Sequence, residues 1–155
     1  NDSTIKDRVS SVFLTGLSSG GQEVMKFVTT SKEYADMITG VVPFSSPGYN
    51  PAGIEFAKSA KVQALVFSGK SDTVGNFTAS MEFAKLLNGT FIPEPETHGG
   101  WQEYYNPAHT ELIEGKQQSI YQWMLSKVST AAEPPATPKV LFELYENGTW
   151  KQINK

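Results

Sequence analysis

One serine of the chain stands in a pattern typical of a catalytic nucleophile. An apolar, β-prone run at residues 12–14 leads into Gly-x-Ser-x-Gly at residues 16–20, and helix-forming sequence follows. This order is expected of a nucleophile elbow, a tight strand-to-helix turn that raises one serine hydroxyl, here that of Ser18, above the edge of a sheet. Gly16 and Gly20 are expected where any side chain would collide as strand and helix close around the turn.

A serine hydroxyl needs a base to accept its proton and a carboxylate to orient that base. The chain has two histidines, His98 and His109. His98 follows the fourth predicted strand, and the two glycines after it leave the loop free to return the imidazole toward the elbow. His109 lies beside helix-start signals, so His98 is the stronger candidate for the base.

The candidate acid is Asp72, which follows the third predicted strand by a short turn. Ser18, Asp72 and His98 therefore each come just after a strand, on one rim of the predicted sheet. Their order along the chain is that of a known class of Ser-Asp-His triads. Aspartate after a strand is also common as a turn former, and Gly-x-Ser-x-Gly alone is a weak signal. The conjunction of context, order and placement predicts a serine hydrolase.

The tetrahedral intermediate of such a reaction needs at least two hydrogen-bond donors for its oxyanion. The backbone N–H of Ser19, at the start of the helix, is expected to be one of them. The other normally comes from a loop after an earlier strand, and no earlier strand is predicted here. Trp101, Tyr104 and Tyr105 are candidates for the wall of a substrate pocket beside His98. Alternatively, these three side chains pack the loop against the last helix.

The elements that must position these residues alternate along the chain. Alternation of strand and helix predicts an α/β fold with about four parallel strands and flanking helices. In such sheets ligands bind at the carboxyl ends of the strands, where Ser18 is expected. The predicted strands are 9–15, 38–44, 62–68 and 90–94, and the predicted helices are 20–30, 54–59, 78–87 and 120–128.

The domain organisation follows from composition. Residues 1–128 form the predicted domain, and residues 129–138 form a linker with three prolines and an extended backbone. Residues 139–155 hold two β-prone runs around Asn147-Gly148, a strong hairpin signal. This tail either docks on the main domain or begins a further domain that is cut short.

Composition limits the partners. With 155 residues, 39% of them hydrophobic, and a net charge of −3, the chain is an ordinary globular sequence without the basic character of nucleic-acid or anionic-membrane binding. No apolar run approaches the roughly 20 residues of a membrane span. There is no cysteine, and neither metal-ligand spacing nor a phosphate loop is present, so no metal or cofactor is expected.

The compartment is suggested by Asn-x-Ser/Thr triplets. They occur at Asn1, Asn76, Asn88 and Asn147, where roughly one would be expected by chance. This excess favours a secreted chain, or a periplasmic one if the source is bacterial. The alternative is that these are polar loop residues.

These segments together resemble the C-terminal half of an α/β-hydrolase. The similarity is to secreted microbial esterases related to polyhydroxybutyrate depolymerases, to feruloyl esterases and to "predicted peptidase" carboxylesterases, and it covers roughly residues 8–127. In those proteins the elbow resembles Leu-Thr-Gly-Leu-Ser-x-Gly-Gly, a glycine precedes the acid, and a tryptophan and a tyrosine follow the histidine. The matching residues here are Gly69, Asp72, His98, Trp101 and Tyr104.

The resemblance implies hydrolysis of a small-molecule or polysaccharide-linked ester through an acyl-serine. It makes Ser18 the nucleophile, His98 the base and then the acid, and Asp72 the residue that orients the histidine. Family members carry about four more strands before the elbow, and a loop among them supplies the second oxyanion donor. The strand before Ser18 is therefore expected to be an edge with unpaired backbone, and one sheet face is expected to lack a covering helix.

These departures predict a fragment, a proteolysed product, or a chain that a missing N-terminal half or a partner chain completes. Weak or absent esterase activity is expected of the chain alone. A non-catalytic binding module, linked to carbohydrate-active domains through the proline-rich segment, is the competing hypothesis. A flavodoxin-like domain is a third, although the first βα turn has no phosphate-binding pattern beyond its glycines.

Overall fold

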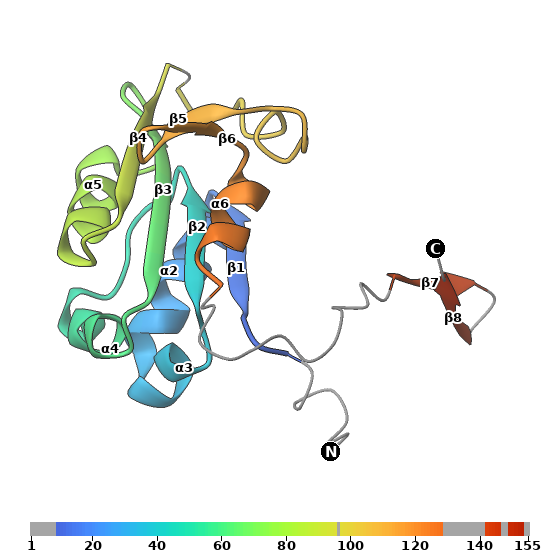
Figure 1. Cartoon of the computed structure of the whole chain (residues 1–155). Helices are drawn as coiled ribbons and strands as arrows, with labels where there is room; N and C mark the ends of the chain where they lie inside the picture. Colours follow the sequence, from blue (N-terminus) through green and yellow to red (C-terminus); the bar gives the residue numbers. More distant parts are fainter. Residues whose placement is uncertain (1–8, 96, 129–141, 147–148, 154–155) are drawn as a thin grey trace.

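A parallel sheet with helices on both faces organises the molecule (Figure 1). It is seen in a computed structural model that describes residues 9–95, 97–128, 142–146 and 149–153. The strands are β1 (Phe13–Leu17), β2 (Gly40–Phe44), β3 (Gln63–Gly69) and β4 (Thr90–Glu94), in the spatial order β1-β2-β3-β4. All three neighbouring pairs are parallel, so the predicted α/β class is confirmed.

Successive side chains of the central strands point to opposite faces, and both faces are buried. Val41 and Val66 pack into one cluster, whereas Val42 and Phe67 pack into the other. Near-continuous apolar runs are therefore required in these strands, as is usual for parallel sheets. The first face is covered by α2 (Ser19–Thr30), α3 (Lys32–Asp36), α4 (Ile54–Ser59) and α5 (Phe77–Leu86).

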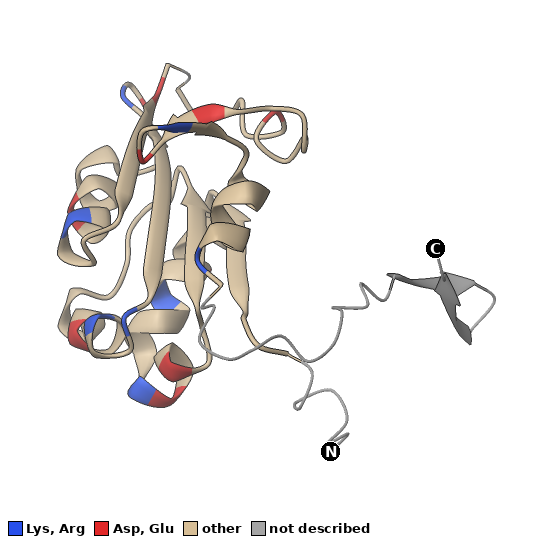
Figure 2. Ribbon diagram, viewed as in Figure 1, with Lys and Arg blue, Asp and Glu red and all other residues tan. Residues whose placement is uncertain are grey.

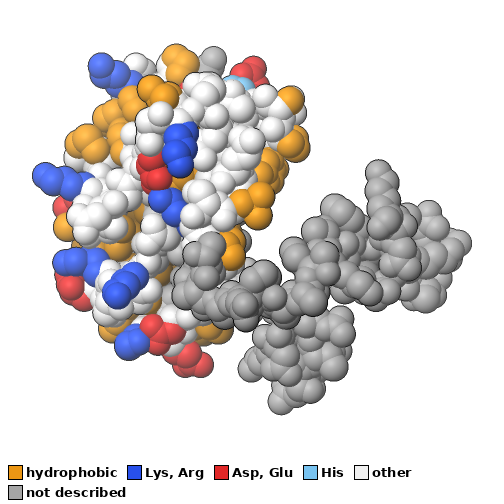
Figure 3. Space-filling view, viewed as in Figure 1, with side chains coloured by type: hydrophobic (Ala, Val, Ile, Leu, Met, Phe, Trp, Pro, Cys, Tyr) orange, Lys and Arg blue, Asp and Glu red, His pale blue; other side chains and the backbone are white. Residues whose placement is uncertain are grey.

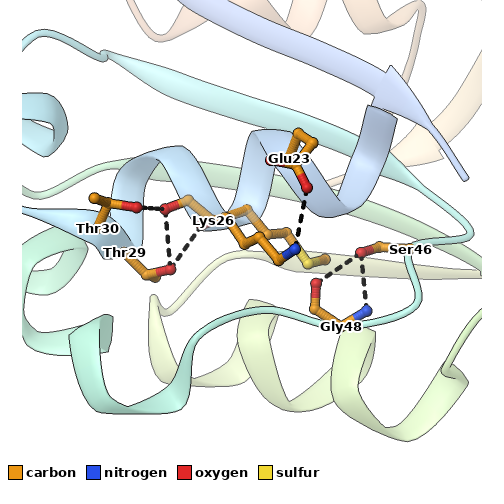
Figure 4. Close-up of polar contacts among 7 residues, drawn as sticks. Glu23, Lys26, Thr29, Thr30, Ser46 and Gly48 are labelled. Atoms are coloured by element: carbon orange, nitrogen blue, oxygen red, sulfur yellow. Dashed lines mark hydrogen bonds and ion pairs between the residues drawn. The ribbon is translucent and has the colours of Figure 1, made fainter. Parts of the chain in front are cut away.

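Helix α2 is the element that leads away from the serine turn. Val24, Met25 and Val28 follow helical spacing and are buried on the sheet. The exposed side carries a Glu23–Lys26 ion pair, with 3.1 Å between Oε1 and Nζ (Figure 4). Packing of this apolar stripe holds the helix against the sheet.

The second face is covered by α6 (Ile120–Ser126) and a short hairpin, β5 (Glu111–Ile113) with β6 (Lys116–Gln118). Trp123 of α6 is fully buried against this face, and its Nε1–H donates to Glu114 Oε1 at 3.0 Å. Lys127 Nζ lies 2.7 Å from Glu114 Oε2. The expectation that one face lacks a covering helix is therefore wrong, because α6 and the hairpin occupy it.

Several element bounds differ from the predicted ones. Strand β1 begins at Phe13 instead of residue 9 and extends to Leu17, because it ends where β2 ends in the pairing register. Helix α3 and the 3-10 turn at Pro51–Gly53 lie outside the helices predicted from the sequence. The β5–β6 hairpin was not predicted, because its strands are three residues long and mostly polar.

Strand β1 lies at one edge of the described sheet, as predicted. Strands β1, β2 and β3 carry no charged residue, whereas charged residues occur on the helices, the hairpin, β4 and several loops (Figure 2). Hydrophobic side chains gather along the right-hand margin of Figure 3, where β1 and α6 lie. Exposed apolar residues of these two elements are Leu17, Tyr121 and Leu125.

The tail forms a separate antiparallel pair, β7 (Phe142–Glu146) with β8 (Thr149–Ile153). Glu146 pairs with Thr149 across the turn, which confirms the predicted hairpin. The Asn147-Gly148 turn itself, the linker 129–138, and the triplets at Asn1 and Asn147 lie outside the described residues.

Candidate active site

Ser18 occupies the turn between β1 and α2, at the carboxyl end of its strand. Its backbone has φ 54° and ψ −122°, a conformation that L-residues adopt rarely. The turn is held because Ser18 N–H donates to the carbonyl of Phe44 on β2 at 2.9 Å. This strained geometry is the one that a nucleophile elbow requires.

The tight turn depends on small residues, but not on both predicted glycines. A Cβ at Gly16 would lie 2.6 Å from the carbonyl carbon and oxygen of Gly20, so the prediction for Gly16 is confirmed. A Cβ at Gly20 would meet nothing within 4 Å, so the prediction for Gly20 is wrong. Gly21 is the second crowded position, since its Cβ would lie 2.8 Å from Phe44 O. The second glycine of the Gly20-Gly21 pair could have indicated this position from the sequence.

Asp72 lies in the turn after β3, and its side chain is fully buried. Its Oδ1 accepts hydrogen bonds from the backbone N–H groups of Val74 (2.8 Å) and Gly75 (2.7 Å). Burial raises the pKa of Asp72, but the hydrogen bonds from His98, Gly75 and Val74 outweigh it and leave the pKa below its ordinary value. The carboxylate is therefore ionised at neutral pH.

His98 lies between the other two predicted residues. Its Nδ1 is 2.8 Å from Asp72 Oδ2, and its Nε2 is 3.0 Å from Ser18 Oγ. An ionised carboxylate only accepts hydrogen bonds, so in the neutral ring Nδ1 carries the proton and Nε2 accepts from the serine hydroxyl. The structure thus brings Ser18, His98 and Asp72 into one continuous hydrogen-bonded row.

His109, the alternative base, is placed elsewhere. Its Nε2 is 3.0 Å from Glu111 Oε1, and its ring meets the Tyr104 ring edge-on at 4.8 Å. It therefore belongs to the packing of the loop before β5.

The three aromatic residues after His98 have different surroundings. Trp101 is half-buried and meets the His98 ring edge-on, with 5.0 Å between ring centroids. Tyr104 is only 8% exposed and packs on Phe44 and Phe67, so it has little surface left for a substrate and fits the packing alternative.

Tyr105 links the loop to the strand before Ser18. Its hydroxyl lies 2.6 Å from Thr15 Oγ1, which itself donates to Val42 O at 2.9 Å. Because the single Thr15 proton is used on Val42, Tyr105 is the donor to Thr15. Tyr121 of α6 donates its hydroxyl to the Tyr105 carbonyl at 3.0 Å. This link was not predicted, since no local pattern joins residues 90 positions apart.

Ser19 is the first residue of α2. Its N–H belongs to the first helical turn, where amides have no acceptor within the helix and the helix dipole favours negative charge. It lies next to Ser18 in the chain, as the predicted oxyanion donor must.

Among the described residues, no three or more His, Asp or Glu side chains are grouped to hold a metal ion. None of the helices described is long and apolar enough to cross a membrane. A hollow of about 540 Å³ near Thr39, Lys61 and Gln63 lies at the amino ends of β2 and β3, away from Ser18.

Comparisons with known proteins give a limited result. No family model matches the chain, and no curated protein matches it. Among solved structures, the acylaminoacyl peptidase of Pyrococcus horikoshii in an orthorhombic crystal form has a TM-score of 0.48 and 15% identity, over 60% of this chain and 20% of that one. The uncomplexed form of that peptidase gives 0.46 and 16%, over 59% and 20%. Likenesses this weak assign neither a family nor an activity to the chain.

Proposed function

We propose that this chain carries the catalytic residues of a serine hydrolase that cleaves carboxylic esters through an acyl-serine intermediate. The observation that carries the proposal is the row Ser18 Oγ, His98 Nε2, His98 Nδ1 and Asp72 Oδ2, with successive contacts of 3.0 and 2.8 Å. These distances lie within the range expected between a nucleophile, its base and the group that orients the base.

In the proposed reaction, Ser18 Oγ attacks the ester carbonyl carbon while its proton passes to His98 Nε2. The ionised Asp72 stabilises the imidazolium that forms. The Ser19 N–H stabilises the oxyanion. His98 then donates the proton to the departing alkoxide, which leaves as the alcohol. A water molecule, deprotonated by His98, releases the acid and restores Ser18.

The substrate in this proposal is a small-molecule or polysaccharide-linked ester, and the enzyme acts after export from the cytoplasm. The half-buried Trp101 beside His98 is proposed to contact the substrate. We further propose that the β1 edge pairs with additional strands, from an N-terminal half or a partner chain, and that these supply the second oxyanion donor. Esterase activity of the 155-residue chain alone is accordingly expected to be weak.

A fluorophosphonate probe tests the proposal without requiring full turnover, because it reports only the reactivity of the serine. The probe should label Ser18 in the folded chain, and Ser18→Ala should not be labelled. A matched control is Ser19→Ala, which removes the neighbouring hydroxyl but retains the backbone N–H. Absence of labelling in the folded chain would contradict the proposal and support a non-catalytic binding module. Turnover of p-nitrophenyl acetate then measures how much esterase activity the chain has without the proposed additional strands.

A further inference from the structure

The serine turn and the acid turn are joined through one short segment after β2. Ser18 N–H donates to Phe44 O at 2.9 Å, and Asn76 N–H, just past the acid turn, donates to Ser46 O at 2.8 Å. Ser46 is itself fixed, since its Oγ contacts both the N–H (3.2 Å) and the carbonyl (3.1 Å) of Gly48 (Figure 4). The two turns therefore share a backbone support that sets their separation.

Gly75 lies between the segment after β2 and the Asp72 side chain. Its N–H donates to Asp72 Oδ1 at 2.7 Å, beside that of Val74 at 2.8 Å. With Oδ1 occupied by two backbone donors, the other oxygen, Oδ2, is directed to His98 Nδ1 at 2.8 Å. The two backbone bonds thus decide which carboxylate oxygen faces the imidazole.

The absence of a side chain at this position is also required. A Cβ at Gly75 would lie 2.5 Å from Asp72 Oδ2 and 2.8 Å from the Ser45 carbonyl oxygen. Gly75 is not among the glycines with positive φ, so a left-handed backbone is not the reason for glycine at this position. Glycine is needed here because a Cβ would be too close both to the Asp72 carboxylate and to the Ser45 backbone.

We propose that Gly75 is a positioning residue for Asp72: its N–H holds Oδ1, and its missing Cβ leaves the space in which Oδ2 faces His98. This inference rests on the proposed function, because it assigns the group that keeps the hydrolase triad aligned. An alanine at this position displaces the carboxylate or the Ser45 backbone and weakens the Asp72–His98 contact.

The test compares Gly75→Ala with Gly99→Ala in the full chain. Gly99 is a matched control: it adjoins His98, has no positive φ, and a Cβ there meets nothing within 4 Å. With a ¹⁵N-histidine label, proton NMR follows the His98 Nδ1–H signal, which shifts to low field when bonded to a carboxylate. The rate of fluorophosphonate labelling at Ser18, and kcat and KM for p-nitrophenyl acetate, are measured on the same samples.

In Gly75→Ala we expect the low-field Nδ1–H signal to move or vanish. Labelling and kcat should fall roughly 10- to 100-fold with little change in KM, since small misplacements of catalytic groups have effects of this size. Gly99→Ala should match the parent chain. A folded Gly75→Ala chain with an unchanged Nδ1–H signal would overturn the inference, even if the probe labels Ser18 of the parent chain as the proposed function requires. If the signal moves as expected but Ser18 of the parent is never labelled, the positioning role stands and the proposed hydrolysis fails.

A second measurement needs no variant, in case Gly75→Ala does not fold. In the parent chain, the amide proton shifts of Val74 and Gly75 should titrate together with the Asp72 carboxyl carbon. Their common midpoint should lie below the ordinary aspartate value of 3.8, because the hydrogen bonds lower that pKa. Amide shifts that do not respond to the ionisation of Asp72 would overturn the inference.

Discussion

His98 Nε2 lies 3.0 Å from Ser18 Oγ although 80 positions separate the two residues along the chain. The contact exists because β1 and β4 end at the same rim of one parallel sheet. The loop after β4 then returns the imidazole across that rim, over the turn that follows β1. The relationship distinguishes His98 from the chain's other histidine.

His98→Ala should reduce fluorophosphonate labelling of Ser18 by about 10²- to 10⁴-fold, the usual contribution of a general base. The serine would then lack an acceptor for its proton. The matched control is His109→Ala, which removes a ring that contacts Glu111 instead and should leave the labelling rate within about twofold. Equal effects of the two substitutions would contradict the assigned base.

Gly16→Ala should lower the free energy of unfolding by about 1–3 kcal/mol, because its Cβ would overlap the Gly20 carbonyl group at 2.6 Å. Gly20→Ala should instead be neutral or add up to about 1 kcal/mol, since the position is open and alanine favours the helix. Urea unfolding monitored by tryptophan fluorescence gives both values. The prediction fails if Gly20→Ala is the more damaging change.

Glu114→Gln should destabilise the chain by up to about 1 kcal/mol at neutral pH, since the carboxylate is partly exposed. Burial raises the pKa of Glu114, but hydrogen bonds from Lys127, Trp123 and Thr90 and the Lys127 charge lower it overall. A lowered pKa gives stability that is present above the ordinary value of 4.5 and is lost as the pH falls through the folded-state pKa.

The measurement for Glu114 is urea unfolding of parent and variant at neutral pH and at successively lower pH. The difference between the two chains should shrink as the pH falls below 4.5. Glu23→Gln, which removes an exposed helix ion pair, is the control and should change stability by less than about 0.5 kcal/mol. A difference for Glu114→Gln that grows on acidification would refute the assignment.

The Thr15–Tyr105 hydroxyl contact should show a coupling energy of about 0.5–1.5 kcal/mol in a double-mutant cycle with Thr15→Val and Tyr105→Phe. The contact ties the loop after His98 to the strand before Ser18, with 2.6 Å between the two oxygens. Thr30→Val, which removes only a bond to Lys26 O within α2, should add to Tyr105→Phe without coupling. The cycle is measured by urea unfolding, and zero coupling for Thr15 would show that the contact contributes nothing to stability.

Much of the architecture was readable from local patterns. Apolar runs with β propensity located the four parallel strands. Apolar residues at helical spacing, Val24 and Val28 among them, indicated the helix after the serine turn, where both are buried in the structure. The hairpin of β5 and β6 was not predicted, because strands of three residues are too short to show a periodic pattern. Strand ends also moved, since pairing register and not propensity sets where β1 stops.

The candidate site likewise has features that the sequence predicted and features that only the structure revealed. From the sequence alone, Gly-x-Ser-x-Gly after a strand identified Ser18, and position after strands placed Asp72 and His98 on one rim. These are local properties of a few neighbouring residues. Only the tertiary structure decided that His98 and not His109 reaches Ser18, that Tyr104 is core, and that Gly75 crowds the Asp72 carboxylate. The reason is physical: these contacts join segments brought together by sheet pairing and side-chain packing, and their ångström-scale distances have no counterpart in spacing along the chain.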